Sequence, residues 1–139
     1  MKMKAYVGIW IDHEKAFIVS IAGDHVSISD IVSNVDGHIR VSGGSRTSTP
    51  YGPQEGPSEG RREERRRQKL RQYYKKIISI ISDSEEFFIF GPGEAKRELM
   101  KEMKKSKDLY SRIVGTETTD KMTERQIKAK VMKFFISNT

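Results

Sequence analysis

The sequence of 139 residues contains no cysteine, so it can form neither a disulfide nor a thiolate metal site. Its three histidines, His13, His25 and His38, lack the spacing of metal ligands. It also lacks a run of about 18 apolar residues, and its N-terminus lacks the long apolar region and cleavage site of a secretory signal. These absences predict a cytoplasmic protein that has no membrane partner, no metal and no other cofactor.

Positive charge is abundant, and it is concentrated in one block. Residues 61–76, "RREERRRQKLRQYYKK", hold nine basic and two acidic residues, which equals the net charge of +7 for the whole chain. Such a block suits a phosphate backbone, because Lys and Arg displace its condensed counterions. The alternative is an ordinary solvated helix face. The clustering of the charge and the polar loop that precedes it favour nucleic acid.

The first third of the chain has the pattern of a three-stranded antiparallel meander. Apolar residues alternate over residues 5–11, and residues 16–22 and 26–33 are rich in β-branched side chains, with short turns between them. From about residue 43 to residue 60, Gly, Ser, Thr and Pro dominate. A connection of this length is either functional or disordered, and we expect a mobile loop.

A long helix is predicted from about residue 59 to residue 82. Its apolar stripe consists of Leu70, Tyr74, Ile77, Ile78 and Ile81. The stripe is missing before Leu70, so the first turns should project beyond the core, with the side chains of residues 61–67 fully solvated. We expect Tyr73 and Tyr74, at the start of the stripe, to lie in or near the core.

The last third alternates strands and helices. Residues 87–90, "FFIF", predict a central strand covered on both faces, and residues 91–103 a helix with Pro92 in its first turn. Residues 111–118 predict a further strand, and Thr123 and Gln126 form a capping box before the last helix. The predicted fold is a single three-layer α/β domain over residues 1–139, of order βββαβαβα with a mixed sheet, as in the ribonuclease H-like fold.

Two segments of this fold carry candidate chemistry. Asp12, at the end of the first strand, could be one carboxylate of a metal-dependent nuclease, or a turn residue that hydrogen-bonds its own backbone. We expect its neighbour His13 to be an exposed turn residue. The segment "GPGEAK", residues 91–96, resembles a phosphate-binding loop only loosely, and its glycines also suit a sharp strand-to-helix turn.

A family resemblance rests on three segments: the polar loop, the basic helix and "FFIFGPGEAKRELMKEM". Together they resemble the middle domain of archaeal and eukaryotic class I peptide chain release factors. They are more similar still to its stand-alone bacterial and archaeal relatives, known as translational machinery or host attachment proteins. The resemblance extends from Val7 to about Phe135. It implies a translation protein that binds the ribosome, through ribosomal RNA or the tRNA acceptor end.

In release factors the loop carries a Gly-Gly-Gln tripeptide that promotes hydrolysis of peptidyl-tRNA. This sequence has no such tripeptide, and its nearest equivalents are Gly43-Gly44-Ser45 and Gly52-Pro53-Gln54. The resemblance makes Gln54 and Gly52 the candidate catalytic residues. Because Pro53 restricts the backbone, peptidyl-tRNA hydrolysis and binding without chemistry both stay open.

The resemblance also implies an RNA-binding surface. Its candidate residues are Arg46, Tyr51, Arg61, Arg62, Arg65, Arg66, Arg67, Lys69 and Arg71. The function predicted is insertion of the loop into an RNA site, for ribosome rescue or for occupation of idle ribosomes. Two alternatives remain: a nuclease that uses Asp12, and an adaptor whose loop binds a protein. The sequence does not predict the oligomeric state.

Overall fold

The computed structural model describes residues 4–35 and 55–137, and of residues 55–59 and 137 it describes the backbone alone. The elements in chain order are β1 Ala5–Ile11, β2 Lys15–Ala22, β3 His25–Val32, α1 Glu55–Ile81, β4 Glu86–Gly91, α2 Ala95–Met103, α3 Lys107–Ser111, β5 Ile113–Thr118 and α4 Glu124–Ser137. The predicted order of strands and long helices is confirmed. The short helix α3, between α2 and β5, is an addition that the sequence pattern did not predict.

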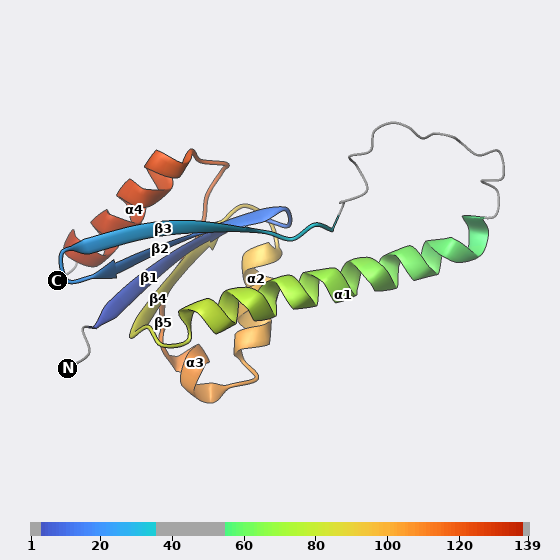
Figure 1. Ribbon diagram of the computed structural model, residues 1–139, viewed down its shortest axis with the longest axis horizontal. Helices are drawn as coiled ribbons and strands as arrows, with labels where there is room; N and C mark the ends of the chain where they lie inside the picture. Colours follow the sequence, from blue (N-terminus) through green and yellow to red (C-terminus); the bar gives the residue numbers. More distant parts are fainter. Residues whose placement is uncertain (1–3, 36–54, 138–139) are drawn as a thin grey trace.

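The five strands form one mixed sheet in the order β3-β2-β1-β4-β5. The meander β1–β2–β3 is antiparallel, whereas β4 pairs in parallel with both β1 and β5. Helices α1, α2 and α3 lie on one side of the sheet and α4 lies on the other (Figure 1). The predicted three-layer α/β fold is therefore confirmed.

Strand β4 illustrates how the sheet serves two hydrophobic cores. Phe87 and Ile89 belong to the core under α1 and α2, while Phe88 and Phe90 belong to the core under α4. All four are almost completely buried. This arrangement confirms the prediction of a central strand, because consecutive strand side chains point to opposite faces.

Helix α4 is positioned by a capping box and by a glycine in the sheet. The Gln126 amide donates to Thr123 Oγ1 at 3.1 Å, and the Thr123 amide donates to Gln126 Oε1 at 2.9 Å, as predicted. A Cβ atom added at Gly8 of β1 would lie 2.2 Å from Val131 Cγ2. The missing side chain thus lets α4 pack directly on β1.

The turn between β4 and α2 depends on Gly91. Its φ of +142° lies in a region that L side chains rarely adopt, and an added Cβ would lie 2.3 Å from the carbonyl oxygen of Ile11. This geometry fits the sharp strand-to-helix turn. Helix α2 begins only at Ala95, so the prediction that Pro92 lies in its first turn is wrong, because the turn at Gly91 and Gly93 delays the helical backbone.

Helix α1 begins at Glu55. Residues 55–58, which the sequence predicts as the end of the loop, are therefore helical. Pro57 is compatible with this early start, because it lies in the first turn, where a missing amide proton removes no helical hydrogen bond. Within residues 4–35 and 55–137, no helix is both long enough and apolar enough to cross a membrane.

Candidate nucleic-acid interface

The side of α1 that faces the sheet becomes apolar and buried only from Leu70 onward. From Leu70 onward the helix buries Tyr73, Tyr74, Ile77 and Ile81, whereas residues 60–69 include no buried residue. We call residues 60–69 the arm. Figure 1 shows this part of α1 extending beyond the end of the sheet.

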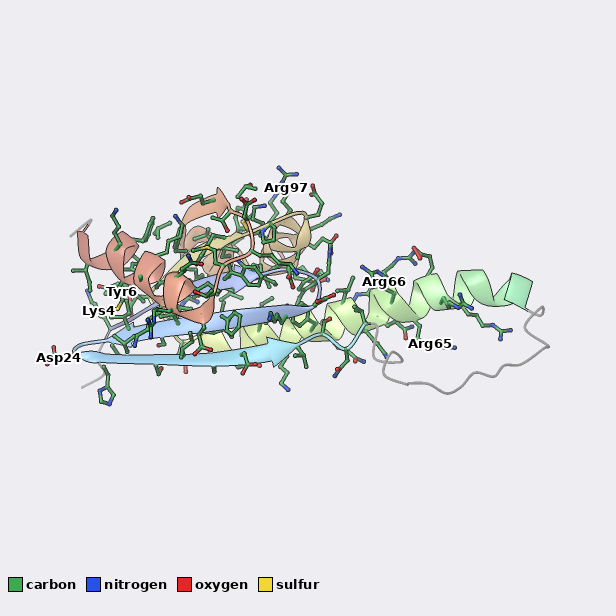
Figure 2. The ribbon with its side chains drawn as sticks, turned by 90° about the horizontal axis from the view of Figure 1, so that it is seen from above. Lys4, Tyr6, Asp24, Arg65, Arg66 and Arg97 are labelled. Carbon is green, nitrogen blue, oxygen red and sulfur yellow. The ribbon has the colours of Figure 1, made fainter. Side chains whose placement is uncertain are left out.

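The arm presents mainly cations. Its six basic residues are Arg61, Arg62, Arg65, Arg66, Arg67 and Lys69, against two acidic residues, Glu63 and Glu64. All are exposed except Arg66 and Lys69, which are half-buried. The prediction that residues 61–67 are fully solvated is thus wrong at Arg66. Figure 2 shows the side chains of Arg65 and Arg66 on the extending part of the helix.

Local contacts support the helical conformation of the arm. Arg67 Nη1 donates to Glu64 Oε1 at 2.8 Å, one turn away, and Gln68 Nε2 donates to Glu64 Oε2 at 3.4 Å. Such exposed pairs contribute only about 0.2–0.5 kcal/mol each. The arm therefore depends for its order on the buried half of the same helix.

The base of the arm is fixed to the ends of β1 and β3. Tyr73 Oη donates to the carbonyl oxygen of Asp12 at 2.9 Å, and Lys69 Nζ donates to that of Asn34 at 3.2 Å. The Ser33 hydroxyl donates to the carbonyl oxygen of His13 at 2.6 Å, which ties the end of β3 to the same turn. These contacts set the direction in which α1 leaves the sheet.

A second group of contacts joins the β1–β2 turn, α1 and α2. Tyr74 Oη donates to Glu98 Oε1 at 2.6 Å, and His13 Nε2 lies 3.1 Å from the same oxygen. Burial raises the pKa of the Tyr74 phenol, and the hydrogen bond to Glu98 raises it further. The prediction that His13 is an exposed turn residue is wrong, because its ring is half-buried against α2.

Asp12 has the geometry of a turn residue. Its Oδ1 accepts hydrogen bonds from the amides of Glu14 and Lys15, both at 2.8 Å. This is the backbone-capping role that the sequence offered as the alternative to a nuclease carboxylate. Across the parts of the chain that the structure describes, no three His, Asp or Glu side chains gather to hold a metal ion.

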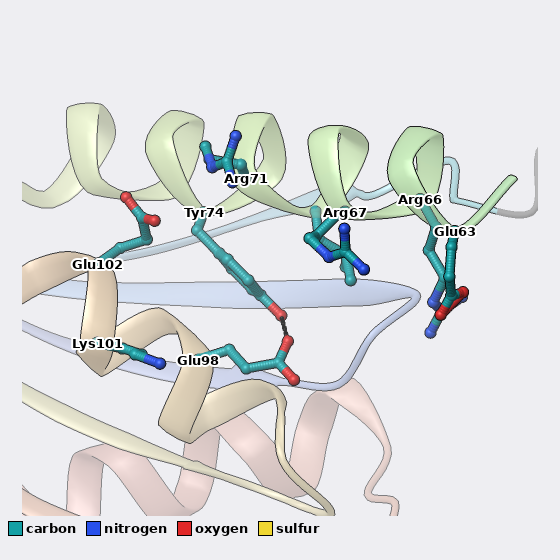
Figure 3. Close-up of a pocket in the computed structure, with 9 residues that line it drawn as sticks. Glu63, Arg66, Arg67, Arg71, Tyr74, Glu98, Lys101 and Glu102 are labelled. Carbon is teal, nitrogen blue, oxygen red and sulfur yellow. Dashed lines mark hydrogen bonds between the residues drawn. The ribbon is translucent and has the colours of Figure 1, made fainter. Parts of the chain in front are cut away.

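A groove of about 310 Å³ runs between α1 and α2, next to the base of the arm (Figure 3). Its lining residues are Glu63, Arg66, Arg67, Leu70, Arg71, Tyr74, Glu98, Lys101 and Glu102. Sequence reasoning named Arg71 but missed Lys101 and Glu98. No local signal distinguishes these two from the other charged residues of α2, since only the packing of α2 against α1 brings them to the groove.

The predicted RNA-binding residues of α1 all lie on the arm or in this groove. The remaining candidates lie outside the described residues. They are Gly43, Gly44, Ser45, Arg46, Tyr51, Gly52 and Gln54.

Comparisons with solved structures show the same fold in two larger proteins. The chain superposes on the Pelota protein of Thermoplasma acidophilum with a TM-score of 0.55 and 14% identity, over 98% of this chain and 33% of that protein. It superposes on an archaeal translation termination factor with a TM-score of 0.56 and 14% identity, over 93% of this chain and 34% of that protein.

The chain thus spans about a third of the length of these proteins. The resemblance to release factors is confirmed as a likeness of fold. No family model matches the sequence, and no curated protein sequence matches it.

Proposed function

We propose that this protein is a ribosome-associated module that binds RNA through the arm. The observation that carries the proposal is the arm itself: ten helical residues with six cations and no buried residue, extending past the sheet. A helix that buries nothing over this length gains no stability from packing. A phosphate backbone is the partner whose charge such a surface complements.

The fold supports the ribosome as the source of that RNA, because a third of an archaeal translation termination factor has the same fold. In this proposal the segment ahead of α1, residues 43–54, enters an RNA cavity while the arm holds the backbone around it. The module would act in rescue of stalled ribosomes or in occupation of idle ones.

Hydrolysis of peptidyl-tRNA with the help of Gln54 is a separate part of the proposal. Glycine next to a reacting ester lets the backbone approach closely, and a positioned donor can stabilise developing negative charge. Pro53 limits the backbone between Gly52 and Gln54. Release of the peptide from peptidyl-tRNA on ribosomes, compared for the wild type and Gln54→Ala, distinguishes hydrolysis from binding alone.

Co-sedimentation with ribosomes in sucrose gradients at low and moderate salt tests the binding. The arm variant changes Arg61, Arg62, Arg65, Arg66 and Arg67 to Gln. A control with the same decrease in charge changes five exposed residues away from α1, namely Lys4, Lys121, Arg125, Lys128 and Lys133. We expect the wild type and the control to sediment with ribosomes and the arm variant to stay at the top.

Two results would contradict the proposal. If the wild type fails to sediment with ribosomes at low salt, the ribosome is not the partner, and an adaptor that binds a protein becomes the better hypothesis. If both five-residue variants lose binding equally, net charge and not the arm determines association.

A further inference from the structure

The groove between α1 and α2 continues the cationic surface of the arm into the body of the protein. Arg67 lies in the arm and Arg71 lies one turn further along α1, so both face the same side of the helix. Both line the groove, and Lys101 approaches it from α2. Its volume is at the lower limit of the range of about 300–1,000 Å³ that is typical of small-ligand sites.

The carboxylates at the inner end of the groove are already engaged. Glu98 accepts the hydrogen bond from Tyr74 and contacts His13, and Glu102 forms an ion pair of 3.0 Å with Lys105. Figure 3 shows Glu63 at the outer end, far from Lys101. None of these three acids forms an ion pair with the inner cations of the groove, Arg71 and Lys101.

Two cations at the inner end of the groove, Arg71 and Lys101, are not held by contacts of this kind. Among the described residues, neither Arg71 nor Lys101 makes a hydrogen bond or an ion pair, and both are exposed. They come from two different helices that the packed body holds together. Arg offers a planar fork of donors that matches a phosphate, and Lys adds a mobile point charge.

We propose that this groove binds the phosphate backbone of the RNA strand that the arm contacts, with Arg71 on α1 and Lys101 on α2 each contacting a phosphate group from its own wall of the groove. The inference rests on the proposed function, since it extends the same RNA surface from α1 onto α2. The strand would follow the arm and turn into the groove at Arg67. The body of the protein, and not only its arm, then contributes to RNA binding.

The test compares ribosome binding of the wild type with Arg71→Gln, Lys101→Gln and the double variant over a series of KCl concentrations. Removal of one phosphate-binding side chain should reduce the steepness of log K against log salt by about 1. Lys76→Gln on α1 and Lys128→Gln on α4 are the matched controls, because both side chains are exposed and neither lines the groove. We expect the controls to keep the wild-type slope.

A second readout is independent of substitution. Acetylation of lysines in the presence and absence of ribosomes, followed by mass spectrometry, should show Lys101 protected by ribosomes and Lys128 equally reactive in both samples. This measurement reports a contact at Lys101 itself, which a long-range effect of charge would not produce.

Support for the groove requires both results. If the wild type binds ribosomes but the groove variants keep its salt slope, or if Lys101 stays unprotected, the groove site is wrong and binding by the arm stands. If the wild type does not bind ribosomes at low salt, the proposed function fails and the groove site fails with it.

Discussion

The two halves of helix α1 have opposite surroundings, although they belong to one continuous element. The arm contributes no buried residue, whereas the half after Leu70 contributes several residues to the core under α1 and α2. Under the proposed function, stability and RNA binding are therefore separated along a single helix. Substitutions in one half should change the free energy of unfolding, and substitutions in the other half should change only the affinity for RNA.

The strongest test of this separation compares Ile77→Ala with Arg62→Ala. Ile77 is fully buried, so its truncation should lower the free energy of unfolding by about 2–5 kcal/mol. Arg62 is exposed in the arm, and its truncation should change that quantity by less than about 0.5 kcal/mol. Urea denaturation followed by circular dichroism measures both. If Arg62→Ala lowers the free energy of unfolding as much as Ile77→Ala does, the arm must pack against other residues of the protein.

The body of the protein is the part that sequence patterns predict well, because each element carries its own local signal. Thr123 and Gln126 lie three residues apart and specify the start of α4 without reference to the rest of the chain. The run of residues 87–90 indicates burial on both faces by its composition alone. Local signals of this kind were sufficient to predict the three layers and the order of the main elements.

The contacts that orient the arm could not be predicted in the same way. His13 and Glu98 are 85 residues apart, and they meet only because the β1–β2 turn and α2 lie at the same end of the sheet. Glu98 differs in no local respect from Glu94 or Glu102. Helix α3 was missed for a different reason, since its five residues contain no buried side chain and hence no apolar period.

A second prediction concerns Tyr74, which joins the buried half of α1 to α2. Tyr74→Phe removes the hydrogen bond to Glu98 and should lower the free energy of unfolding at pH 7 by about 1.5 kcal/mol. Ribosome binding through the arm should persist if the direction of the helix is also held by Tyr73. If Tyr74→Phe is folded but does not bind ribosomes, Tyr74 is needed to orient the arm.

The cost of Tyr74→Phe should also depend on pH. The pKa of Tyr74 is raised in the folded protein above its ordinary value of 10.0, chiefly by burial. Below pH 10 the folded and unfolded states both keep the phenol proton, so the difference in free energy of unfolding between wild type and variant is constant. Above pH 10 the unfolded chain loses this proton first, and the advantage of the wild type should shrink by about 1.4 kcal/mol per pH unit. Urea titrations at pH 8 and pH 10.5 measure this change, and a constant difference would mean that the phenol is not shielded.

The smallest expected effect on stability comes from Glu64→Gln in the arm. The pair that Glu64 forms with Arg67 is more than half exposed on both sides, so its removal should change the free energy of unfolding by less than about 0.5 kcal/mol. The same substitution removes one of the two negative charges of the arm, and it should strengthen ribosome binding at moderate salt. Glu117→Gln is the matched control, because it breaks an ion pair with Lys130 of similar length on the opposite side of the sheet. If both variants bind ribosomes with the same affinity, the charge of the arm does not determine that affinity. If only Glu64→Gln binds more tightly, the exposed half of α1 affects ribosome binding without affecting folding.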